Sequence, residues 1–430
     1  MPGLYIHIPF CRKKCGYCAF YSAENTEKID GYIDALAREA EIFGAAMRGF
    51  VFDTAYLGGG TPSLLSPKNF EKIFGAMYKN FSFKAGAEIS VEGNPSDFCG
   101  ENKVKFLRAA GVNRLSVGIQ TMNGETLKKI GRIQTEQNNL LALEKISETF
   151  DNFSADVMIG LPGEGIREVE KTLKSILKFD AKHISAYALK VEENTPLHKT
   201  VKNGEVEIPS DDDAADAYDF TLDFLKARGI ERYEISNFAR KNYRCEHNLN
   251  YWKRGEYLGL GAAAHSFLRG VRFENQRGLD TYTESLKRGE GAAFYAEEIV
   301  SGGAGLEKAK NNSGIETEEK PGGAGLEKAK NNRVNETENI SGGVGSGEKT
   351  AFKFEKITPK DALFEKIMLG FRLKEGINIA ETEMEFGVNF LEKYRGVLDV
   401  YGKCFDFKDG NIAVKDNYFY IVNSLIEKFM

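Results

Sequence analysis

Tyr5-Ile-His-Ile-Pro-Phe-Cys-Arg-Lys-Lys-Cys-Gly-Tyr-Cys18 places three cysteines in one short loop directly after an apolar run. Cys11, Cys15 and Cys18 have the spacing CxxxCxxC. The irons of a cubic [4Fe–4S] cluster normally take one cysteine each, so three thiolates hold three irons and leave the fourth without a protein ligand. That iron is an open position where a substrate or cofactor can bind. The spacing therefore predicts a cluster with one free coordination site.

Two other interpretations of these cysteines are a zinc knuckle completed by His7 and three unrelated thiols. Zinc sites usually pair cysteines as CxxC…CxxC or CxxC…HxxxH, and no second pair follows here, so the cluster is favoured. The other cysteines, Cys99, Cys245 and Cys404, are scattered and predict ordinary, partly buried thiols. Clustered thiolates in a chain of this length fit a reducing cytoplasm rather than a disulfide scaffold.

Outward from this loop, the first half of the chain alternates strand-like and helix-like segments. Short apolar runs lie at residues 4–8, 54–57, 88–91, 114–117, 155–159 and 183–189. Between them apolar residues recur at helical spacing, as Ile29, Ile33, Leu36 and Ala40 do. Strand–helix units in series predict a parallel sheet with right-handed crossovers. Spacing alone leaves a barrel and an open doubly wound sheet as alternatives.

Glycine and polar motifs follow the expected strands, at the edge where ligands bind in such sheets and barrels. The glycines of Gly58-Gly-Gly-Thr61 let the backbone approach a ligand closely, although a glycine run alone also fits a tight turn. Glu92 can accept hydrogen bonds from ribose hydroxyls or an ammonium group, or it can be a charge near a helix N-terminus. Gln120 ends the fourth expected strand and Asp156 lies within the fifth.

Longer motifs give the chain a resemblance to the radical S-adenosylmethionine (SAM) superfamily. They are Tyr5–Cys11, Leu57–Pro62, Glu92–Pro95, Arg114–Gln120, Asp156–Gly163 and Tyr233–Ala239. The branch that they resemble holds the oxygen-independent coproporphyrinogen III dehydrogenases (HemN) and the HemW-type heme chaperones. The resemblance covers most of residues 3–290 and, more loosely, 355–430. It implies an α/β fold, a partial (β/α)6 TIM-like radical SAM barrel with a C-terminal α+β winged-helix-like domain.

The resemblance also implies cofactors and the residues that hold them. Cys11, Cys15 and Cys18 would carry a [4Fe–4S] cluster whose open iron chelates the amino and carboxylate groups of SAM. The positions that match SAM contacts in the family are Tyr5, Tyr17, Gly59, Gly60, Thr61, Glu92, Gln120, Arg132 and Asp156. Whether one or two SAM molecules bind stays open, and no residue is assigned a catalytic role.

One departure separates the two parts of this branch. The pattern of the dehydrogenases is CxxxCxxCxC, with a further cysteine two residues beyond the third, whereas this chain has Phe20 at that position. The missing cysteine is not a cluster ligand in the usual scheme, so its absence affects the expected substrate chemistry rather than the cluster. CxxxCxxCxF is the form typical of HemW.

A second discriminating segment is His247-Asn-Leu-Asn-Tyr-Trp252, which resembles the HNxxYW motif associated with heme binding in HemW. Neutral imidazole is a common axial ligand of heme iron, and aromatic rings can cover a porphyrin face. The alternative is a buried, hydrogen-bonded histidine with the tyrosine and tryptophan in a core. His265 is a competing candidate for the heme ligand.

The chain divides into four expected parts. Residues 1–230 form the barrel, 231–296 carry the heme motif and extend the barrel, and 353–430 form the C-terminal domain. Residues 297–352 interrupt them: Ser301–Asn312 returns almost unchanged twenty residues later. This repeat has few large apolar residues, so we expect a disordered insertion without a catalytic role.

In the C-terminal part, Thr358 and Pro359 predict a helix start, and Asp409-Gly410 predicts a hairpin turn. Winged-helix modules often bind DNA, but 58 basic and 63 acidic residues, a net charge of −5, argue against nucleic acid as a partner. No apolar run of about 18 residues and no signal-peptide pattern is visible. We therefore expect a cytoplasmic protein, with peripheral membrane contact and a homodimer left open.

Two functions follow as hypotheses. The first is a heme chaperone that binds a [4Fe–4S] cluster, SAM and heme, and delivers heme to apoproteins such as respiratory enzymes. The second is an oxygen-independent coproporphyrinogen III dehydrogenase of porphyrin biosynthesis. Phe20 and the HNxxYW string both favour the chaperone and predict that dehydrogenase activity is absent.

Overall fold

The computed structural model describes residues 2–302, 316–317 and 353–430. Its centre is one curved sheet with the strand order β12-β13-β11-β10-β9-β1-β2-β3-β4-β5-β6-β8-β7. The six strands that begin the chain are parallel to one another: β1 Gly3–Ile8, β2 Val51–Gly59, β3 Ser82–Gly93, β4 Arg114–Gln120, β5 Phe153–Ile159 and β6 His183–Ala188. They match the six strands expected from the sequence and confirm the α/β fold class.

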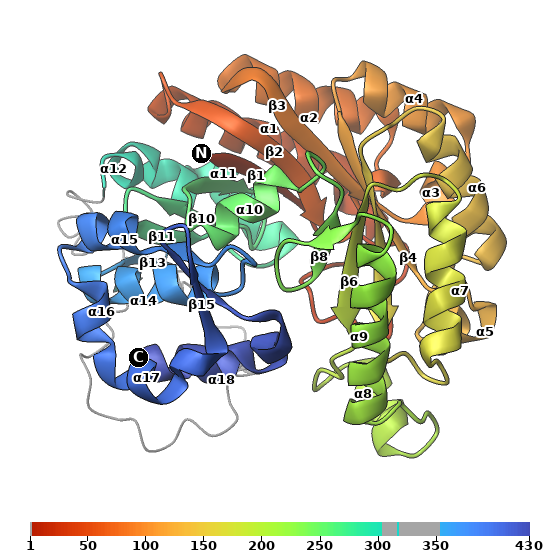
Figure 1. The fold of residues 1–430 in the computed structure, drawn as a ribbon. Coiled ribbons are helices and arrows are strands. Elements are labelled where there is room, and N and C mark those ends of the chain that lie inside the picture. The colour runs from red at the N-terminus through yellow and green to blue at the C-terminus, as the bar shows by residue number, and fades with distance from the viewer. Residues whose placement is uncertain (1, 303–315, 318–352) are drawn as a thin grey trace.

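Helices connect these strands and cover the outer face of the sheet (Figure 1). They are α1 Ile29–Ala46, α2 Pro67–Asn80, α3 Pro95–Phe98, α4 Glu101–Ala109, α5 Gly124–Lys129, α6 Glu136–Ser147, α7 Ile166–Leu177, α8 Pro196–Lys202 and α9 Asp211–Lys226. On α1, Ile33, Leu36 and Ala40 are buried, as their helical spacing predicts. Helix α2 begins with a capping box between Ser66 and Asn69.

The two faces of the parallel strands have opposite chemistry. Alternate side chains of a strand point to opposite faces. One set is apolar and joins the core beneath the helices, for example Leu57 of β2, Val91 of β3 and Leu115 of β4. The other set is polar and lines the hollow side of the sheet, for example Tyr56, Glu92 and Ser116. The sheet therefore uses its apolar face for stability and leaves its polar face for ligands.

The barrel is incomplete, as the family resemblance implies. Strand β6 is followed by antiparallel β8 Asn237–Ala239 and β7 Glu231–Arg232 rather than by further parallel strands. On the other edge, β9 Tyr257–Leu260 pairs in parallel with β1. The antiparallel strands β10 His265–Leu268, β11 Val271–Glu274 and β13 Lys353–Lys356 and the short β12 Glu316–Thr317 extend that edge. Helices α10 Glu246–Trp252, α11 Leu279–Arg288 and α12 Ala296–Val300 belong to this part.

A separate C-terminal domain has its own apolar core, centred on Ile367, Phe371 and Phe390. It contains α14 Pro359–Gly370, β14 Ile377–Asn378, α15 Ile379–Phe386, α16 Phe390–Lys393, α17 Arg395–Tyr401, β15 Phe405–Lys408, β16 Asn411–Val414 and α18 Val422–Ile426. The side chain of Thr358 caps α14, and the β15–β16 turn has positive φ angles at Asp409 and Gly410. Both features were expected from the sequence, and both favour these residue types.

The structure differs from the expected division into four parts at the boundary between residues 296 and 297. Helix α12 extends to Val300 and buries Ile299, so residues 297–300 belong to the folded barrel extension. Most of the repeat, with its expected disorder, lies outside the described residues. In the described ranges, no helix combines the length and apolar character that crossing a bilayer requires.

The C-terminal domain is attached to the barrel by a half-buried ion-pair cluster. Glu365 of α14 accepts from Arg254 at 2.9 Å and from Arg272 of β11 at 2.8 Å. Its side chain and that of Arg254 are each only 13% exposed. A second pair between the same two parts, Arg244 with Glu375, is exposed to solvent.

We predict that Glu365→Gln destabilises the protein far more than Glu375→Gln. Removing one partner of a buried ion pair leaves an uncompensated charge, which costs about 3–5 kcal/mol when burial is complete; partial exposure of Arg272 reduces this to about 2–3 kcal/mol. The exposed pair is worth at most about 1 kcal/mol. Urea unfolding of the two variants measures the difference, and equal losses of stability would contradict the assignment.

Candidate functional site

The loop after β1 carries the three cysteines and is fixed at both ends by backbone hydrogen bonds. Cys11 N donates to Ala23 O at 3.0 Å, and Ala23 N returns a bond to Pro9 O at 2.8 Å. In the middle of the loop, Gly16 N donates to Ile130 O at 2.9 Å. All three cysteines are half-buried free thiols. The loop thus holds them at the carboxyl end of the parallel strands.

Three cysteine thiols are the ligand type that an iron–sulfur cluster needs, although their sulfur atoms do not converge on one point in this structure. Among the described residues, no three His, Cys, Asp or Glu side chains are arranged so that they could hold a metal ion. Burial raises the pKa of Cys18, so its thiolate form depends on the charge of a bound metal. Thr61 Oγ1 donates to Cys11 Sγ at 3.5 Å, a contact that suits a thiolate acceptor. The loop would need to adjust so that its three thiols converge.

The glycines at the end of β2 allow the close approach of neighbouring backbone and side chains. A Cβ on Gly58 would lie 3.0 Å from Glu92 Oε2, and one on Gly59 would lie 2.5 Å from the His7 ring. On Gly60 it would lie 2.7 Å from Phe10 O. Gly59 also has φ +115°, which favours glycine. These three residues bring β2 against the start of the cysteine loop.

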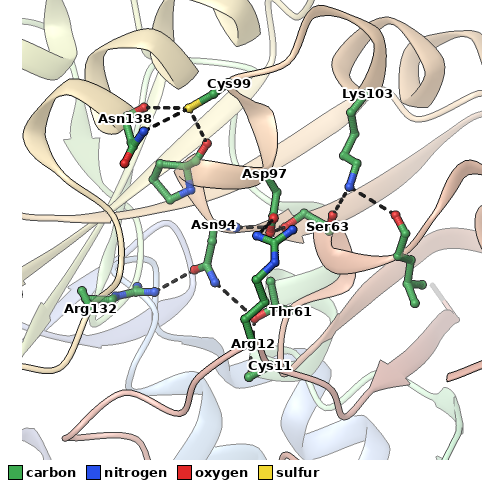
Figure 2. A network of polar contacts seen from close by, with 12 residues as sticks. Cys11, Arg12, Thr61, Ser63, Asn94, Asp97, Cys99, Lys103, Arg132 and Asn138 are labelled. Atoms are coloured by element: carbon green, nitrogen blue, oxygen red, sulfur yellow. Dashed lines mark hydrogen bonds and ion pairs between the residues drawn. The ribbon is translucent and has the colours of Figure 1, made fainter. Parts of the chain in front are cut away.

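A chain of hydrogen bonds leads from the cysteine loop to Arg132 (Figure 2). Beyond Thr61, Asn94 Nδ2 donates to Thr61 Oγ1 at 3.2 Å, and Arg132 Nη1 donates to Asn94 Oδ1 at 2.7 Å. The guanidinium of Arg132 lies 6.0 Å from the centre of the Tyr17 ring. Its Nε is buried and has no hydrogen-bond partner among the residues that the structure describes, so a donor remains for a ligand. Gln120 Nε2 lies in the same place, above Gly118.

The cysteine loop has a second contact, an ion pair between Arg12 and Asp97, which the sequence analysis did not predict. Arg12 Nη1 forms an ion pair with the buried carboxylate of Asp97, which also accepts from Ser63 Oγ at 2.7 Å (Figure 2). Lys103 donates to the backbone carbonyl oxygens of Ser63 and Leu65. The only signal in the sequence is the position of Asp97 soon after the Glu92–Pro95 motif. This pair fixes the loop against α3.

Glu92 lies at the centre of the hollow face, between the glycine turn and two tyrosines. Its Oε1 accepts from Tyr56 OH at 2.7 Å, and its Oε2 accepts from Gly59 N at 3.3 Å. Burial raises the pKa of Glu92 to about 7, and the nearby carboxyl of Asp156 adds to the shift. Burial likewise raises the pKa of Tyr5, which stays protonated and bonds to His7 Nδ1 at 2.9 Å.

Asp156 is the second carboxyl group of this face. It accepts from Ser116 Oγ at 3.0 Å, and burial raises its pKa to about 6. Both carboxyl groups border a small polar cavity of about 30 Å³, room for one or two water molecules. Serines from four neighbouring strands line it: Ser90, Ser116, Ser154 and Ser185.

His247 lies at the opposite end of the strands from the cysteines, because it contacts Thr54 and Gly3 near the start of β2 and β1. Its Nδ1 is 2.7 Å from Thr54 Oγ1 and its Nε2 is 2.9 Å from Tyr251 OH. Burial lowers the pKa of His247 to about 3, so the ring is neutral. Both ring nitrogens are engaged, so iron ligation by His247 would require at least one of these two contacts to break.

The rest of the HNxxYW string does not form a porphyrin pocket in this arrangement. Trp252 packs in a small apolar cluster with Tyr233, Leu249 and Leu373, away from His247. Asn250 Nδ2 donates to Glu256 O at 2.9 Å and so closes the turn after α10. His265, the competing candidate, has a side chain that is 50% exposed.

The partial barrel, the cysteine loop on β1 and the polar hollow face define the class of the protein as a radical SAM protein. The family model for the radical SAM superfamily matches residues 5–176, and that for the HemN C-terminal domain matches residues 357–401. The fold is also similar to that of coproporphyrinogen III oxidase (HemN) from Escherichia coli, with a TM-score of 0.75 and 20% identity over 100% of this chain and 90% of that one.

Sequence comparison narrows the class. The heme chaperone HemW of Buchnera aphidicola (strain Sg) is 40% identical over 61% of this chain and 69% of its own length. HemW of Bacillus subtilis is 37% identical over 66% and 76%, and HemW of E. coli is 35% identical over 69% and 77%. The chain belongs to the HemW family.

We predict that Gly60→Ala lowers stability and that Gly75→Ala does not. The new Cβ at position 60 would meet backbone atoms of Ile8 and Phe10, which cannot move aside cheaply, and overpacking of this kind costs about 1–3 kcal/mol. Gly75 is exposed on α2 with open space around it, and alanine there stabilises a helix by about 1 kcal/mol. Thermal unfolding of both variants measures the effect. An unchanged melting temperature for Gly60→Ala would contradict the close approach.

Proposed function

We propose that this protein is a heme chaperone that holds a [4Fe–4S] cluster at Cys11, Cys15 and Cys18, binds SAM beside it, and delivers heme to apoproteins such as respiratory enzymes. The observation that carries the proposal is the position of the cysteine loop, the glycine turn and Glu92 at one end of the hollow face, in a chain of the HemW family. A cytoplasmic location, in keeping with the free thiols, belongs to the same proposal.

The residues around this end suit the parts of SAM. Glu92 and the backbone of Gly58–Gly60 suit an ammonium group, whereas the remaining donor of Arg132 suits a carboxylate. Tyr5, Tyr17, Thr61, Gln120 and Asp156 complete the proposed SAM site. The open iron of a bound cluster would supply the remaining contact to the amino and carboxylate groups.

The dehydrogenase of porphyrin biosynthesis is the second candidate function. The overall similarity to HemN supports the shared fold but not the shared reaction. Phe20 occupies the position at which the dehydrogenase pattern CxxxCxxCxC has a further cysteine. Its side chain is 73% exposed beside the cluster loop. An apolar, unreactive side chain at this place favours a binding protein over the enzyme.

We assign heme binding to α10, with His247 as the axial ligand once α10 has moved. Beyond heme and its acceptor proteins, we expect no nucleic acid partner. Peripheral membrane contact and a homodimer stay open, as in the sequence analysis. His265 is the alternative ligand because it is accessible without any movement.

We predict that heme titration of the anaerobically reconstituted protein gives a saturable Soret band, and that His247→Ala weakens this binding about tenfold or more through loss of the iron ligand. His265→Ala is the matched control and should bind within about twofold of wild type. A loss confined to His265→Ala would move the site to β10. Absence of specific heme binding, together with decarboxylation of coproporphyrinogen III, would replace the chaperone by the dehydrogenase.

We predict that SAM affinity falls as the pH is lowered through about 7. Glu92 has its pKa raised to about 7, so it becomes neutral below this pH and no longer attracts an ammonium group. Each pH unit below the pKa then costs up to about tenfold in affinity. Calorimetric titration across this range measures the slope, and Glu92→Gln should bind more weakly and with a flatter pH dependence. An identical slope in the variant would exclude Glu92 from the SAM site.

A further inference from the structure

Helix α10 closes the amino-terminal end of the hollow face and is held there from two sides. The carboxylate of Glu88 on β3 accepts from the backbone N of Glu246 at 3.2 Å and of His247 at 3.1 Å, and thus caps the start of the helix. At the other side, the ring of His247 reaches into the barrel and bonds to Thr54. The heme motif is therefore part of the barrel wall in this structure.

Tyr56 connects this helix to the proposed SAM site. Its ring stacks on the ring of His247, with 5.0 Å between centres and 20° between planes, and its hydroxyl donates to Glu92 Oε1 at 2.7 Å. Tyr5, the partner of Tyr56 across the β1–β2 pair, also stacks on His247 at 6.4 Å. The ring of Tyr56 thus contacts His247, the proposed heme ligand, and its hydroxyl contacts Glu92, the carboxylate of the proposed SAM site.

The space around Glu92 leaves little freedom for this arrangement. Tyr56 Cε1 and Glu92 Oε2 would each lie 3.0 Å from a Cβ at Gly58, so both side chains lie close to the space that the glycine leaves. Since packed groups of this kind move between discrete arrangements rather than deform continuously, a shift of Tyr56 must be felt at Glu92.

A second connection runs from Asp156 to the start of α10 and supports the first. Asp156 is hydrogen-bonded to Ser185, whose Oγ is 3.1 Å from Ser154 Oγ. Ser154 bonds to His183 Nδ1 at 2.7 Å, and His183 Nε2 to Tyr233 OH at 2.8 Å.

Tyr233 OH in turn accepts from the backbone N of Cys245, the residue that precedes α10, at 3.1 Å. The small polar cavity that Glu92 and Asp156 border is also lined by Cys245 and Asn248. Glu92 is therefore linked to α10 through Tyr56, and Asp156 is linked to the start of α10 through a longer chain of hydrogen bonds.

We propose that SAM bound beside Glu92 holds α10 in its closed position through Tyr56 and thereby weakens heme binding at His247. Heme ligation requires His247 to leave Thr54 and Tyr251, which also removes the ring that supports Tyr56. The two ligands consequently favour opposite positions of α10, and each lowers the affinity for the other by the same factor. SAM then serves as the signal for heme release. This inference rests on the proposed function and names its regulation.

The test is hydrogen exchange of residues 247–252 in the anaerobically reconstituted protein, with and without SAM. We expect saturating SAM to slow exchange in α10 about fivefold or more in wild type, and by less than about twofold in Tyr56→Phe, which keeps the stacked ring and loses only the bond to Glu92. Tyr218→Phe is the control, because its hydroxyl donates to Ile235 O, away from Glu92, and it should behave as wild type. Trp252, the single tryptophan, gives an independent fluorescence signal from the same helix.

Unchanged exchange of α10 in wild type with SAM, or equal slowing in wild type and Tyr56→Phe, would overturn the proposal. A heme titration with and without SAM forms the second arm. Weaker heme binding in the presence of SAM supports the coupling, and equal affinity overturns it. If wild type binds no heme at all, the proposed function fails, whereas the exchange measurement still decides whether SAM and α10 are coupled.

Discussion

The close approach of the Gly58–Gly60 turn to β1 and its following loop is the constraint on which the whole site depends. A Cβ would lie 2.5 Å from the His7 ring at Gly59 and 2.7 Å from Phe10 O at Gly60, and it would make a tight contact of 3.0 Å with Glu92 at Gly58. Because the turn carries no side chains, the cysteine loop, Thr61 and Glu92 lie at one end of neighbouring parallel strands. The hydrogen bonds from Cys11 through Thr61 and Asn94 to Arg132 join these parts (Figure 2).

The polar inner face of the sheet explains the unusual electrostatics. A typical closed barrel fills its interior with branched apolar side chains. Here the inner positions of β3–β6 carry serines and carboxylic acids, and the apolar residues face the helices. Burial raises the pKa of Glu92 to about 7 and that of Asp156 to about 6, and at Asp156 it outweighs the opposing effect of Arg132 and Arg114. The site is thus chemically prepared for a molecule with an ammonium group.

The sequence predicted the six parallel strands, the cap at Thr358 and the turn at Asp409, because each depends on local patterns of a few residues. The partial barrel was implied by the family resemblance, since strand spacing alone left an open sheet as an alternative. Arg12 and Asp97, which lie 85 positions apart, were not predicted, and neither was the bond of His247 to Thr54 across 193 positions. Periodicity gives the face on which a residue lies but not its partner from a distant strand. The HNxxYW string predicted a heme site at residues 247–252, which stays a prediction, and only the structure places His247 in the barrel wall with both of its ring nitrogens engaged.

The measurement that tests the central claim most directly is heme transfer from the loaded, reconstituted protein to an apo-heme enzyme whose activity returns only when it takes up heme. The account predicts that activity returns at a rate set by the loaded protein and increases when SAM is added, while coproporphyrinogen III offered with SAM and a reductant keeps its carboxyl groups. Failure to restore the acceptor, together with loss of carboxyl groups from the porphyrinogen, would contradict the account.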